Sequence, residues 1–418
     1  MTAAGPRRRL RLGVVGIGHR AEIATWAQRP GLDADVVACA DPAAAGRRRA
    51  RALFGSQVTV AADHRDLVGA GLDGVFVTSP DDTHEQVAVD LLDAGLAVFL
   101  EKPMAITTAG CDRVLAASAA SGAAVFVGHN MRHLAVVTAM RDLVLAGAIG
   151  EVQAVWCRHF VGNGGDYYFR DWHAERAHTT GLLLQKGAHD IDVIHWLAGG
   201  RSTRVTAMGA LAVYGRVPDR RPSPATAVGA AGGDSPGGAS DGGDALMPDW
   251  FDPEGHWPPL TATGLNPVID VEDLSMMLME LDNGVLASYQ QCHFSPDYWR
   301  NYTVLGTAGR LENFGDTDGA VVKVWNRRSG YRADADTTVD IAPGGLSHGG
   351  ADPLLVEEFL DRVRGVPGGG VSSPIAARDA VAAGCAATES LRSGSRPVDV
   401  PPLPAGLAGL AGAPGATG

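Results

Sequence analysis

A polar series interrupts an otherwise apolar stretch from Gly181 to Gly200, which reads GLLLQKGAHDIDVIHWLAGG. The series consists of Gln185, Lys186, His189, Asp190, Asp192 and His195. Lysine, histidine and carboxylate side chains transfer protons in enzymes, whereas the regular Leu, Ile, Val and Trp spacing is typical of a buried segment. Because a buried polar group needs a hydrogen-bond partner, these residues either find partners locally or line a site.

Helical spacing divides this stretch into two faces, since positions three and four apart share one side of a helix. The face predicted to carry the site consists of Gln185, His189, Asp192 and Trp196. The face predicted to pack consists of Ile191, Ile194, His195 and Ala198, so His195 is expected to be a core or interface histidine. Asp192 is expected to orient His189 or a substrate hydroxyl, and hydrogen bonds from Asp190 and Asp192 to the local backbone are the alternative. No HExxH motif occurs and these side chains cannot converge from one regular helix, so no metal site is predicted.

A second group of residues, near the N-terminus, has the spacing of a dinucleotide site. The segment GVVGIGHRA places Gly16, Gly18 and Ala21 in a G-x-G-x-x-A pattern, which supplies a tight turn, close backbone approach to a pyrophosphate, and a small residue where helix meets strand. Asp41 ends the next strand, where a carboxylate accepts hydrogen bonds from ribose hydroxyls and repels a 2'-phosphate. We therefore predict NAD, with NADP left open by Arg47 and Arg48. A glycine-rich turn without a nucleotide is the alternative.

Three more motifs stand at the ends of predicted strands. They are TSPDDTH (Thr78 to His84), EKP (Glu101 to Pro103) and GHNMR (Gly128 to Arg132). In a doubly wound sheet the carboxyl ends of the strands line the crevice where ligands bind. The residues predicted to contact the cofactor are Gly16, Ile17, Gly18, His19, Arg20, Asp41, Ser79, Pro80, Asp82, His84, Glu101, Lys102 and Asn130.

With these motifs together, the chain resembles the Gfo/Idh/MocA family of sugar and cyclitol dehydrogenases from about Arg9 to about Ser395. The resemblance implies a Rossmann domain, a C-terminal open-sheet domain, tightly held NAD(P), and oxidation or reduction at a ring carbon of a carbohydrate. It also maps the family's EKP lysine onto Lys102 and its helix-borne histidine onto His189. The family's aspartate four residues before that histidine is Gln185 here, and glutamine cannot exchange a proton at ordinary pH. Lys186 is predicted to replace it in a proton relay.

The chemistry that these residues would perform is the oxidation of a secondary alcohol. That reaction needs a base for the hydroxyl proton and a cation beside the developing alkoxide, and we assign these roles to His189 and Lys102. A surface lysine paired with Glu101 is the alternative for Lys102. Two other functions stay open: an NAD-dependent glycoside hydrolase that uses transient oxidation, elimination, hydration and re-reduction, and a non-enzymatic sensor of cofactor state.

A loop from Val161 to Thr180, VGNGGDYYFRDWHAERAHTT, is rich in aromatic and charged residues. Aromatic rings stack on the C–H faces of sugars while charged groups bind hydroxyls, so this composition is typical of carbohydrate binding. Contact with a neighbouring subunit is the alternative. The similar stretch His293 to Tyr302, HFSPDYWRNY, is expected to form the far wall of the site. The substrate-binding candidates are Arg158, His159, Tyr168, Trp172, His173 and Asp192.

The elements that position these residues suggest an α/β protein. Six short β-branched runs alternate with helical patterns up to GHNMR, which predicts βαβ units and a doubly wound parallel Rossmann sheet in residues 1–132. After Gly150 strands follow one another directly, and Asn283-Gly284 indicates a hairpin. Residues 133–395 are thus expected to form an α+β domain with an open, largely antiparallel sheet and helices on one face. A flexible insertion is predicted at 217–243 and a disordered tail at 396–418.

Composition limits the possible partners. The 418 residues, 45% hydrophobic and 20% charged, suit two globular domains, and a net charge of -12 disfavours nucleic acid. No apolar run approaches the roughly 18 residues of a membrane span, and no signal-peptide core is evident, so we expect a cytoplasmic protein. Five scattered cysteines without a CxxC spacing indicate reduced thiols. The family resemblance implies a homodimer or homotetramer joined through the exposed sheet face.

Overall fold

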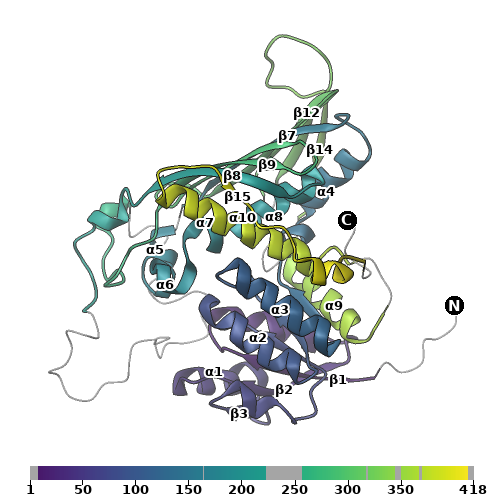
Figure 1. Cartoon of the computed structure of the whole chain (residues 1–418), viewed down its shortest axis with the longest axis vertical. Coiled ribbons are helices and arrows are strands. Elements are labelled where there is room, and N and C mark those ends of the chain that lie inside the picture. The colour runs from purple at the N-terminus through teal and green to yellow at the C-terminus, as the bar shows by residue number, and fades with distance from the viewer. Residues whose placement is uncertain are drawn as a thin grey trace.

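The structure is a computed structural model that describes residues 8–162, 164–222, 257–316, 319–343, 350–366 and 370–412. It contains a six-stranded and a nine-stranded sheet, which lie at opposite ends of the molecule with helices between them (Figure 1). The first sheet is parallel throughout, in the order β3-β2-β1-β4-β5-β6. The predicted doubly wound Rossmann sheet is therefore confirmed.

The strands of the first sheet are short apolar runs, because helices cover both of its faces. They are β1 (Leu10–Val15), β2 (Ala34–Ala40), β3 (Thr59–Ala61), β4 (Gly74–Val77), β5 (Ala97–Leu100) and β6 (Val125–Val127). The helical elements of this half are η1 (His19–Gln28), α1 (Ala44–Phe54), η2 (His64–Leu67), η3 (Asp81–Thr83), α2 (His84–Asp93), α3 (Thr108–Ser121) and η4 (Asn130–His133). The segment after Gly18 thus forms a 3-10 helix.

The second sheet is mixed and mostly antiparallel, in the order β14-β13-β12-β11-β7-β10-β9-β8-β15, with β7 and β10 as its parallel pair. Its strands are β7 (Val152–Phe160), β8 (Ser202–Ala210), β9 (Leu274–Leu281), β10 (Leu286–Cys292), β11 (Trp299–Gly306), β12 (Gly309–Phe314), β13 (Val321–Trp325), β14 (Thr337–Asp340) and β15 (Val398–Asp399). The predicted hairpin at Asn283-Gly284 is confirmed: it joins β9 to β10, and Gly284 has a φ of 84°, which favours glycine.

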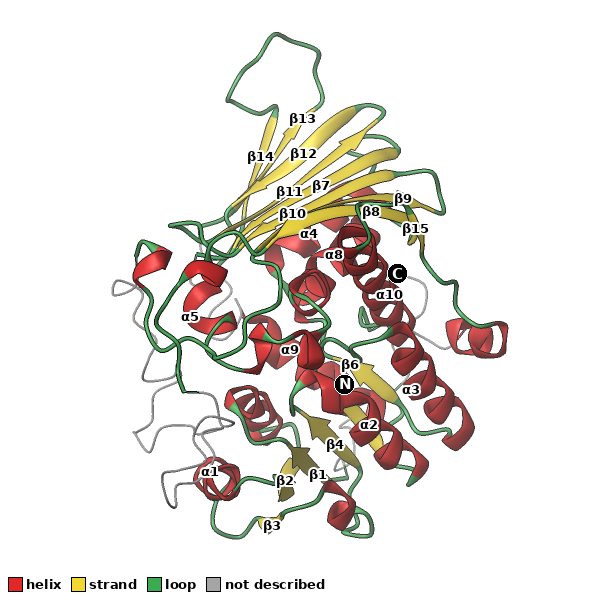
Figure 2. Cartoon of the chain, turned by 60° about the vertical axis from the view of Figure 1, so that its left-hand side comes forward, coloured by secondary structure: helices red, strands yellow, loops and turns green. Residues whose placement is uncertain are grey.

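One face of this sheet packs against helices, as predicted. The covering helices are α4 (Ala135–Leu145), α8 (Gly187–Ala198) and α10 (Pro374–Arg392), which lie between the sheet and the N-terminal half (Figure 2). The short elements near them are α5 (Gly164–Tyr168), η5 (Trp172–Ala174), α6 (Arg176–Thr179), α7 (Leu182–Gln185), η6 (Tyr214–Arg216), η7 (Pro259–Thr261) and η9 (Ala405–Gly412). The opposite face, which we call the outer face, carries exposed apolar side chains. Among these are Trp156, Met208, Met276, Leu278 and Leu286.

Helix α9 (Ala351–Val363) corrects the predicted domain boundary. The prediction assigned it to the C-terminal domain with the rest of 133–395, but it packs on the Rossmann sheet. The ring of Phe359 lies 5.1, 5.6 and 5.9 Å from the rings of Phe76, Phe99 and Phe126. An amphipathic pattern reveals that a helix has a core face but does not reveal which sheet that face covers.

The prediction of a disordered tail at 396–418 is wrong for residues 396–412. Strand β15 pairs with β8, and the guanidinium of Arg378 donates to the carbonyl oxygens of Pro401 and Pro402 at 2.6 and 3.0 Å. Leu407 is buried in the core of the Rossmann half. Long-range pairing thus orders a segment whose composition alone indicates no core. Residues 413–418, and the predicted insertion from residue 223 on, lie outside the described residues.

No helix in the described ranges is both long enough and apolar enough to cross a membrane.

The packing of α9 predicts that Phe359→Ala destabilises the protein. Truncating a fully buried phenylalanine should lower the free energy of unfolding by about 3–5 kcal/mol. Urea-induced unfolding measures the change. Val366→Ala, at a position that is 47% exposed, is the control and should change stability by no more than about 0.5 kcal/mol. Equal effects of the two substitutions would contradict the assignment of α9 to the Rossmann core.

Candidate active site

The turn after β1 has the shape that a dinucleotide requires. Gly16 has a φ of +80°, and a Cβ there would lie 2.4 Å from the Cα of Ser79, so only glycine fits. The hydroxyl of Thr78 donates to the carbonyl of Gly16 at 2.6 Å and holds the turn against the loop after β4. A Cβ at Gly18 would meet nothing within 4 Å. The turn therefore leaves open space at the position where the motif expects a pyrophosphate.

Asp41 is held at the end of β2 by backbone donors. Its carboxylate oxygens accept hydrogen bonds from the N–H groups of Ile17 and Ala43 at 2.7 and 2.8 Å. The guanidinium of Arg47 donates to the carbonyl oxygens of Asp41 and Pro42 at 2.8 and 2.7 Å, so it supports the same loop. These residues fit the ribose end of a dinucleotide, and the preference for NAD stays a prediction.

Two predicted cofactor residues after β4 connect loops in the structure. The ring nitrogens Nδ1 and Nε2 of buried His84 lie 2.7 and 2.9 Å from the carbonyl oxygens of Pro103 and Ser79. His84 therefore joins the EKP turn to the loop after β4. The carboxylate of Asp82 pairs with Nδ1 of His178 in the C-terminal half at 2.8 Å. Both side chains position the cofactor loops through these contacts.

Three further cofactor candidates are connected to Asp352 of α9: Arg20 and Asn130 contact it directly, and Glu101 is joined to it through Arg20. Arg20 donates to Oε1 of Glu101 at 2.6 Å and to both carboxylate oxygens of buried Asp352 at 2.6 and 2.9 Å. The amide of Asn130 donates to Asp352 at 3.3 Å. We call these four residues the Arg20 cluster. Arg20 donates to one carboxylate oxygen of Glu101, and the backbone N–H of Lys102 donates to the other at 3.1 Å. The cluster therefore holds the EKP turn in place.

The Lys102 ammonium reaches across to the C-terminal half. It donates to the carbonyl oxygen of Gln185 at 3.4 Å, at the point where α7 ends and before α8 begins at Gly187. Carbonyl groups in the last turn of a helix are without helical partners, so this break supplies an acceptor. Burial lowers the pKa of Lys102, and the charges of Asp81 and Glu101 partly offset that effect. The alternative of a surface lysine paired with Glu101 does not describe this geometry.

His189 stands on α8, which follows the break, and the charge of Lys102 acts on its ring. Burial lowers its pKa well below the ordinary value, and the charges of Lys102, His129 and Lys186 add to the effect. The imidazole is therefore neutral near pH 7. Its Nδ1 is buried and has no hydrogen-bond partner among the described residues. A neutral imidazole with a free nitrogen is suited to accept a proton.

The polar residues of α8 point in different directions, which corrects the prediction of one site face and one packing face. Every residue of α8 is buried. Asp192 accepts two hydrogen bonds from Arg132, both at 2.7 Å, and pairs with Nδ1 of His129 at 3.1 Å. These contacts do not include the predicted partner His189, and a contact of Asp192 with substrate stays a prediction. The prediction of a core histidine is confirmed, because His195 is buried and bonds the hydroxyl of Ser202 at 2.8 Å.

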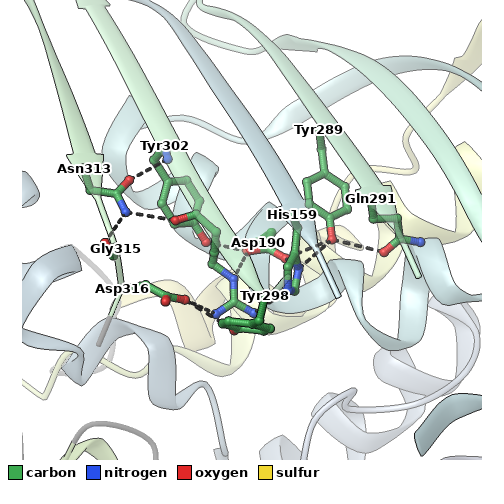
Figure 3. A network of polar contacts seen from close by, with 10 residues as sticks. His159, Asp190, Tyr289, Gln291, Tyr298, Tyr302, Asn313, Gly315 and Asp316 are labelled. Atoms are coloured by element: carbon green, nitrogen blue, oxygen red, sulfur yellow. Dashed lines mark hydrogen bonds and ion pairs between the residues drawn. The ribbon is translucent and has the colours of Figure 1, made fainter. Parts of the chain in front are cut away.

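Asp190 is the centre of a buried polar network that links α8 to the sheet (Figure 3). Its carboxylate accepts hydrogen bonds from the hydroxyls of Tyr289 and Tyr302, and it pairs with Nδ1 of His159 at 2.9 Å and with Nε of Arg300 at 2.8 Å. Burial alone would raise the pKa of Asp190, but the charge of Arg300 and the donors hold it well below the ordinary value. The carboxylate is therefore charged, and it is satisfied within the protein.

Two substrate-binding candidates on β7 are corrected by the strand's alternation. His159 faces inward but is fully enclosed in the Asp190 network, where burial and Arg300 lower its pKa to about 3. Arg158 points to the outer face, where it donates to the side chain of Asn301 at 3.0 Å and lies 4.9 Å from the ring of Trp299. Because neighbouring residues of a strand face opposite sides of the sheet, Arg158 and His159 cannot both face one site, as the prediction required.

The aromatic loop does reach the site. The rings of Tyr168 and His173 lie 5.4 Å apart, and Trp172 stacks on His173 at 3.7 Å. The ammonium of Lys186 lies 5.5 Å from the centre of the Tyr168 ring. Their role in substrate binding stays a prediction, but the structure brings Tyr168 beside the lysine that follows the predicted catalytic Gln185.

Two buried side chains that sequence patterns do not single out have atoms without a hydrogen-bond partner among the described residues. Asp81 is 4% exposed and its Oδ2 has no hydrogen-bond partner in the described part of the chain. Burial raises its pKa, against the opposing charges of His84 and Lys102. His293 is fully buried beside Tyr168, and neither ring nitrogen has a described partner. Both residues lie in motifs that the analysis quoted, and only the fold selects them from their neighbours.

The scarcity of lysine in the sequence is a further indication of the site. The chain has 35 Lys and Arg residues, of which only Lys102, Lys186 and Lys323 are lysines. Two of these three lie at the site. Arginine cannot lose its proton at ordinary pH, whereas lysine can when it is buried, so a retained lysine indicates ammonium or amine chemistry.

Comparison with known proteins identifies both halves. Residues 10–129 match the model of the oxidoreductase family with an NAD-binding Rossmann fold, and residues 137–312 match the GFO/IDH/MocA C-terminal domain. The protein YteT of Bacillus subtilis is 28% identical over 69% of this chain and 72% of its own length. Inositol 2-dehydrogenase 1 of Saccharopolyspora erythraea is 35% identical, but over only 47% of this chain and 57% of its own length. A levoglucosan dehydrogenase solved with NADH and levoglucosan has the same fold, with a TM-score of 0.71 at 17% identity over 94% of this chain and 100% of that one.

The surroundings of Lys186 predict an unusually acidic ammonium. Burial, followed by the charges of Arg300 and Lys102, lowers its pKa to about 7, so the amine becomes neutral and nucleophilic above that pH. Competitive acetylation followed by mass spectrometry should give a midpoint near this value for Lys186. Lys323, on β13, is the internal control for the labelling reaction. A midpoint for Lys186 at the ordinary lysine pKa of about 10.4 would contradict the electrostatic description of the site.

Proposed function

The chain belongs to the Gfo/Idh/MocA family of NAD(P)-binding oxidoreductases, and we propose that it transfers hydride between a ring carbon of a sugar, sugar acid or cyclitol and NAD. The observation that carries this proposal is the meeting of Lys102 with the helix break at Gln185, 3.4 Å apart. A cation from the Rossmann half and the neutral imidazole of His189 from the C-terminal half thereby share one site. These are the two groups that alcohol oxidation requires.

In this proposal the protein's own residues handle the proton and the oxygen. His189 accepts the hydroxyl proton, and Lys102 stabilises the negative charge that develops on the oxygen. NAD, when bound, supplies the hydride acceptor. Gln185 cannot relay the proton, but Lys186 can take it, because its pKa of about 7 lets the amine exchange protons at neutral pH. Asp41, at the end of β2, supports NAD rather than NADP.

The relatives support a ring that bears several hydroxyl groups. Two of them are named for inositol and levoglucosan, and both of these molecules are polyhydroxylated rings. The site offers Tyr168 and His173 as aromatic surfaces that suit such a ring. A second candidate is the redox-neutral glycoside hydrolase, which the near-neutral pKa of Lys186 favours, since a neutral amine could remove the proton beside a transient ketone.

We expect His189→Ala to remove dehydrogenase activity. Purified protein with NAD and a panel of pyranosides, uronates and inositols should produce reduced cofactor, seen by its absorbance, and the substitution should lower kcat/KM by about 100-fold or more. His64→Gln, in η2 of the Rossmann half, is the matched control and should retain activity. Release of an aglycone without net reduced cofactor would identify the hydrolase instead. Silence across the panel would refute both.

We also propose that two copies of the chain associate through the outer face of the second sheet. A protein that stays monomeric rarely exposes a contiguous apolar patch, and Met276, Leu278 and Leu286 lie on neighbouring strands with 43%, 64% and 59% of their surface exposed. Leu278→Arg should therefore shift the protein to a smaller species in light scattering. Leu354→Arg, exposed on α9, is the control and should leave the mass unchanged. A monomeric wild-type protein would contradict the proposal.

A further inference from the structure

Lys186 is a charged group at the site that has no ion-pair partner in the described part of the chain. It stands in the break between α7 and α8, and part of its side chain is exposed although its chain neighbours Gln185 and Gly187 are buried. The ammonium makes no hydrogen bond or ion pair with any residue that the structure describes. Its described contact is the face of the Tyr168 ring, 5.5 Å away. A cation held in this way has its donor positions open toward the site.

The neighbouring cations Arg300, Arg132 and Lys102 each have a carboxylate or carbonyl partner. Arg300 pairs with Asp190 at 2.8 Å and Asp316 at 3.2 Å, and Arg132 is matched by Asp192. The Lys102 ammonium has the carbonyl of Gln185 and the nearby charge of Asp81. Two carboxylates, those of Asp190 and Asp316, affect the pKa of Lys186 through their charge. Both of them form ion pairs with Arg300. Among these cations, Lys186 is therefore the one whose ammonium has no hydrogen bond or ion pair with a residue that the structure describes.

We propose that the substrate is a sugar acid whose carboxylate binds Lys186 while its reacting hydroxyl lies between Lys102 and His189. This inference rests on the proposed function, names the substrate class within it, and assigns Lys186 to the carboxylate in place of the proton relay. A carboxylate is the group that an ammonium with open donor positions binds most strongly, through charge-assisted hydrogen bonds. Tyr168, beside Lys186, supplies the aromatic face for the ring, and the unpartnered nitrogens of His293 offer a further polar contact next to Tyr168.

The number of available cations favours a carboxylate over a phosphate. Arg300 already pairs with Asp190 and Asp316, and Lys102 is required at the reacting oxygen. Lys186 therefore offers one ammonium to a bound anion, and a carboxylate carries one negative charge, whereas a phosphate ester carries nearly two. His159, His189 and His293 add no charge, because burial keeps the pKa of each below its ordinary value. A carboxylate would also favour the charged form of Lys186, whose pKa burial lowers to about 7.

Matched pairs of sugars test this inference. With NAD present, kcat/KM is measured for the methyl glycosides of glucose, galactose and mannose and for the corresponding uronates, with glucose 6-phosphate as a further arm. At least one uronate should exceed its neutral partner by about 10-fold or more. Lys186→Gln should reduce that ratio to near one, and Lys186→Arg should retain part of it. Lys323→Gln, on β13 away from the site, is the matched control and should leave the ratio unchanged.

A binding measurement makes the test independent of turnover. The same uronate should raise the melting temperature of the NAD-loaded wild-type protein more than its neutral partner does, and Lys186→Gln should remove the difference. Such binding without oxidation of any sugar would refute the proposed function and leave the carboxylate assignment standing. Neutral sugars that react and bind as well as the uronates, a ratio that Lys186 does not affect, or a preference for the phosphate would each overturn the inference. The wild-type comparison decides the matter even if the glutamine variant fails to fold.

Discussion

The charge of Asp190 is the interaction on which the C-terminal half of the site depends. This carboxylate is fully buried and is bonded by side chains from β7, β10 and β11, so it fixes α8 against the middle of the second sheet (Figure 3). A buried carboxylate is costly unless hydrogen bonds satisfy it, and here two tyrosine hydroxyls and His159 bond its oxygens. Because His189 precedes Asp190 and Lys186 stands just before the helix, the same anchor sets the positions of both.

In the Rossmann half, the Arg20 cluster fixes the position of the site residues. Arg20 binds Glu101 and Asp352 together, and the EKP turn therefore has a fixed relation to α9, which returns to this half late in the chain. Lys102 then extends from a turn held at both ends, with His84 on the carbonyl of Pro103 as the second support. The two halves thus bring two lysines to one place. Burial lowers the pKa of each, and the charge of Lys102 adds to the effect at Lys186. Burial and the charges of both lysines lower the pKa of His189 and keep it neutral.

Much of the fold could be predicted from the sequence, because it depends on local patterns. Alternating strands and helices indicated the parallel sheet, and Asn283-Gly284 indicated the β9–β10 hairpin through the φ that only such residues adopt easily. The errors concern partners that are distant in the chain. Helix α9 covers the first sheet, and the segment after residue 396 pairs with β8. The local sequence of neither segment indicates which sheet it packs against.

The same division applies to the site. Composition and spacing indicate which residue types are present and which strand ends carry them: the glycine turn, Asp41, the EKP motif, and the polar series around His189. The folded arrangement sets how those residues are used. It directs His159 inward and Arg158 outward, assigns Asp192 to Arg132, and leaves Lys186 unpaired among the described residues. The physical reason is that a side chain's charge and freedom depend on neighbours brought close by packing, and local spacing specifies directions only within a single unbroken element.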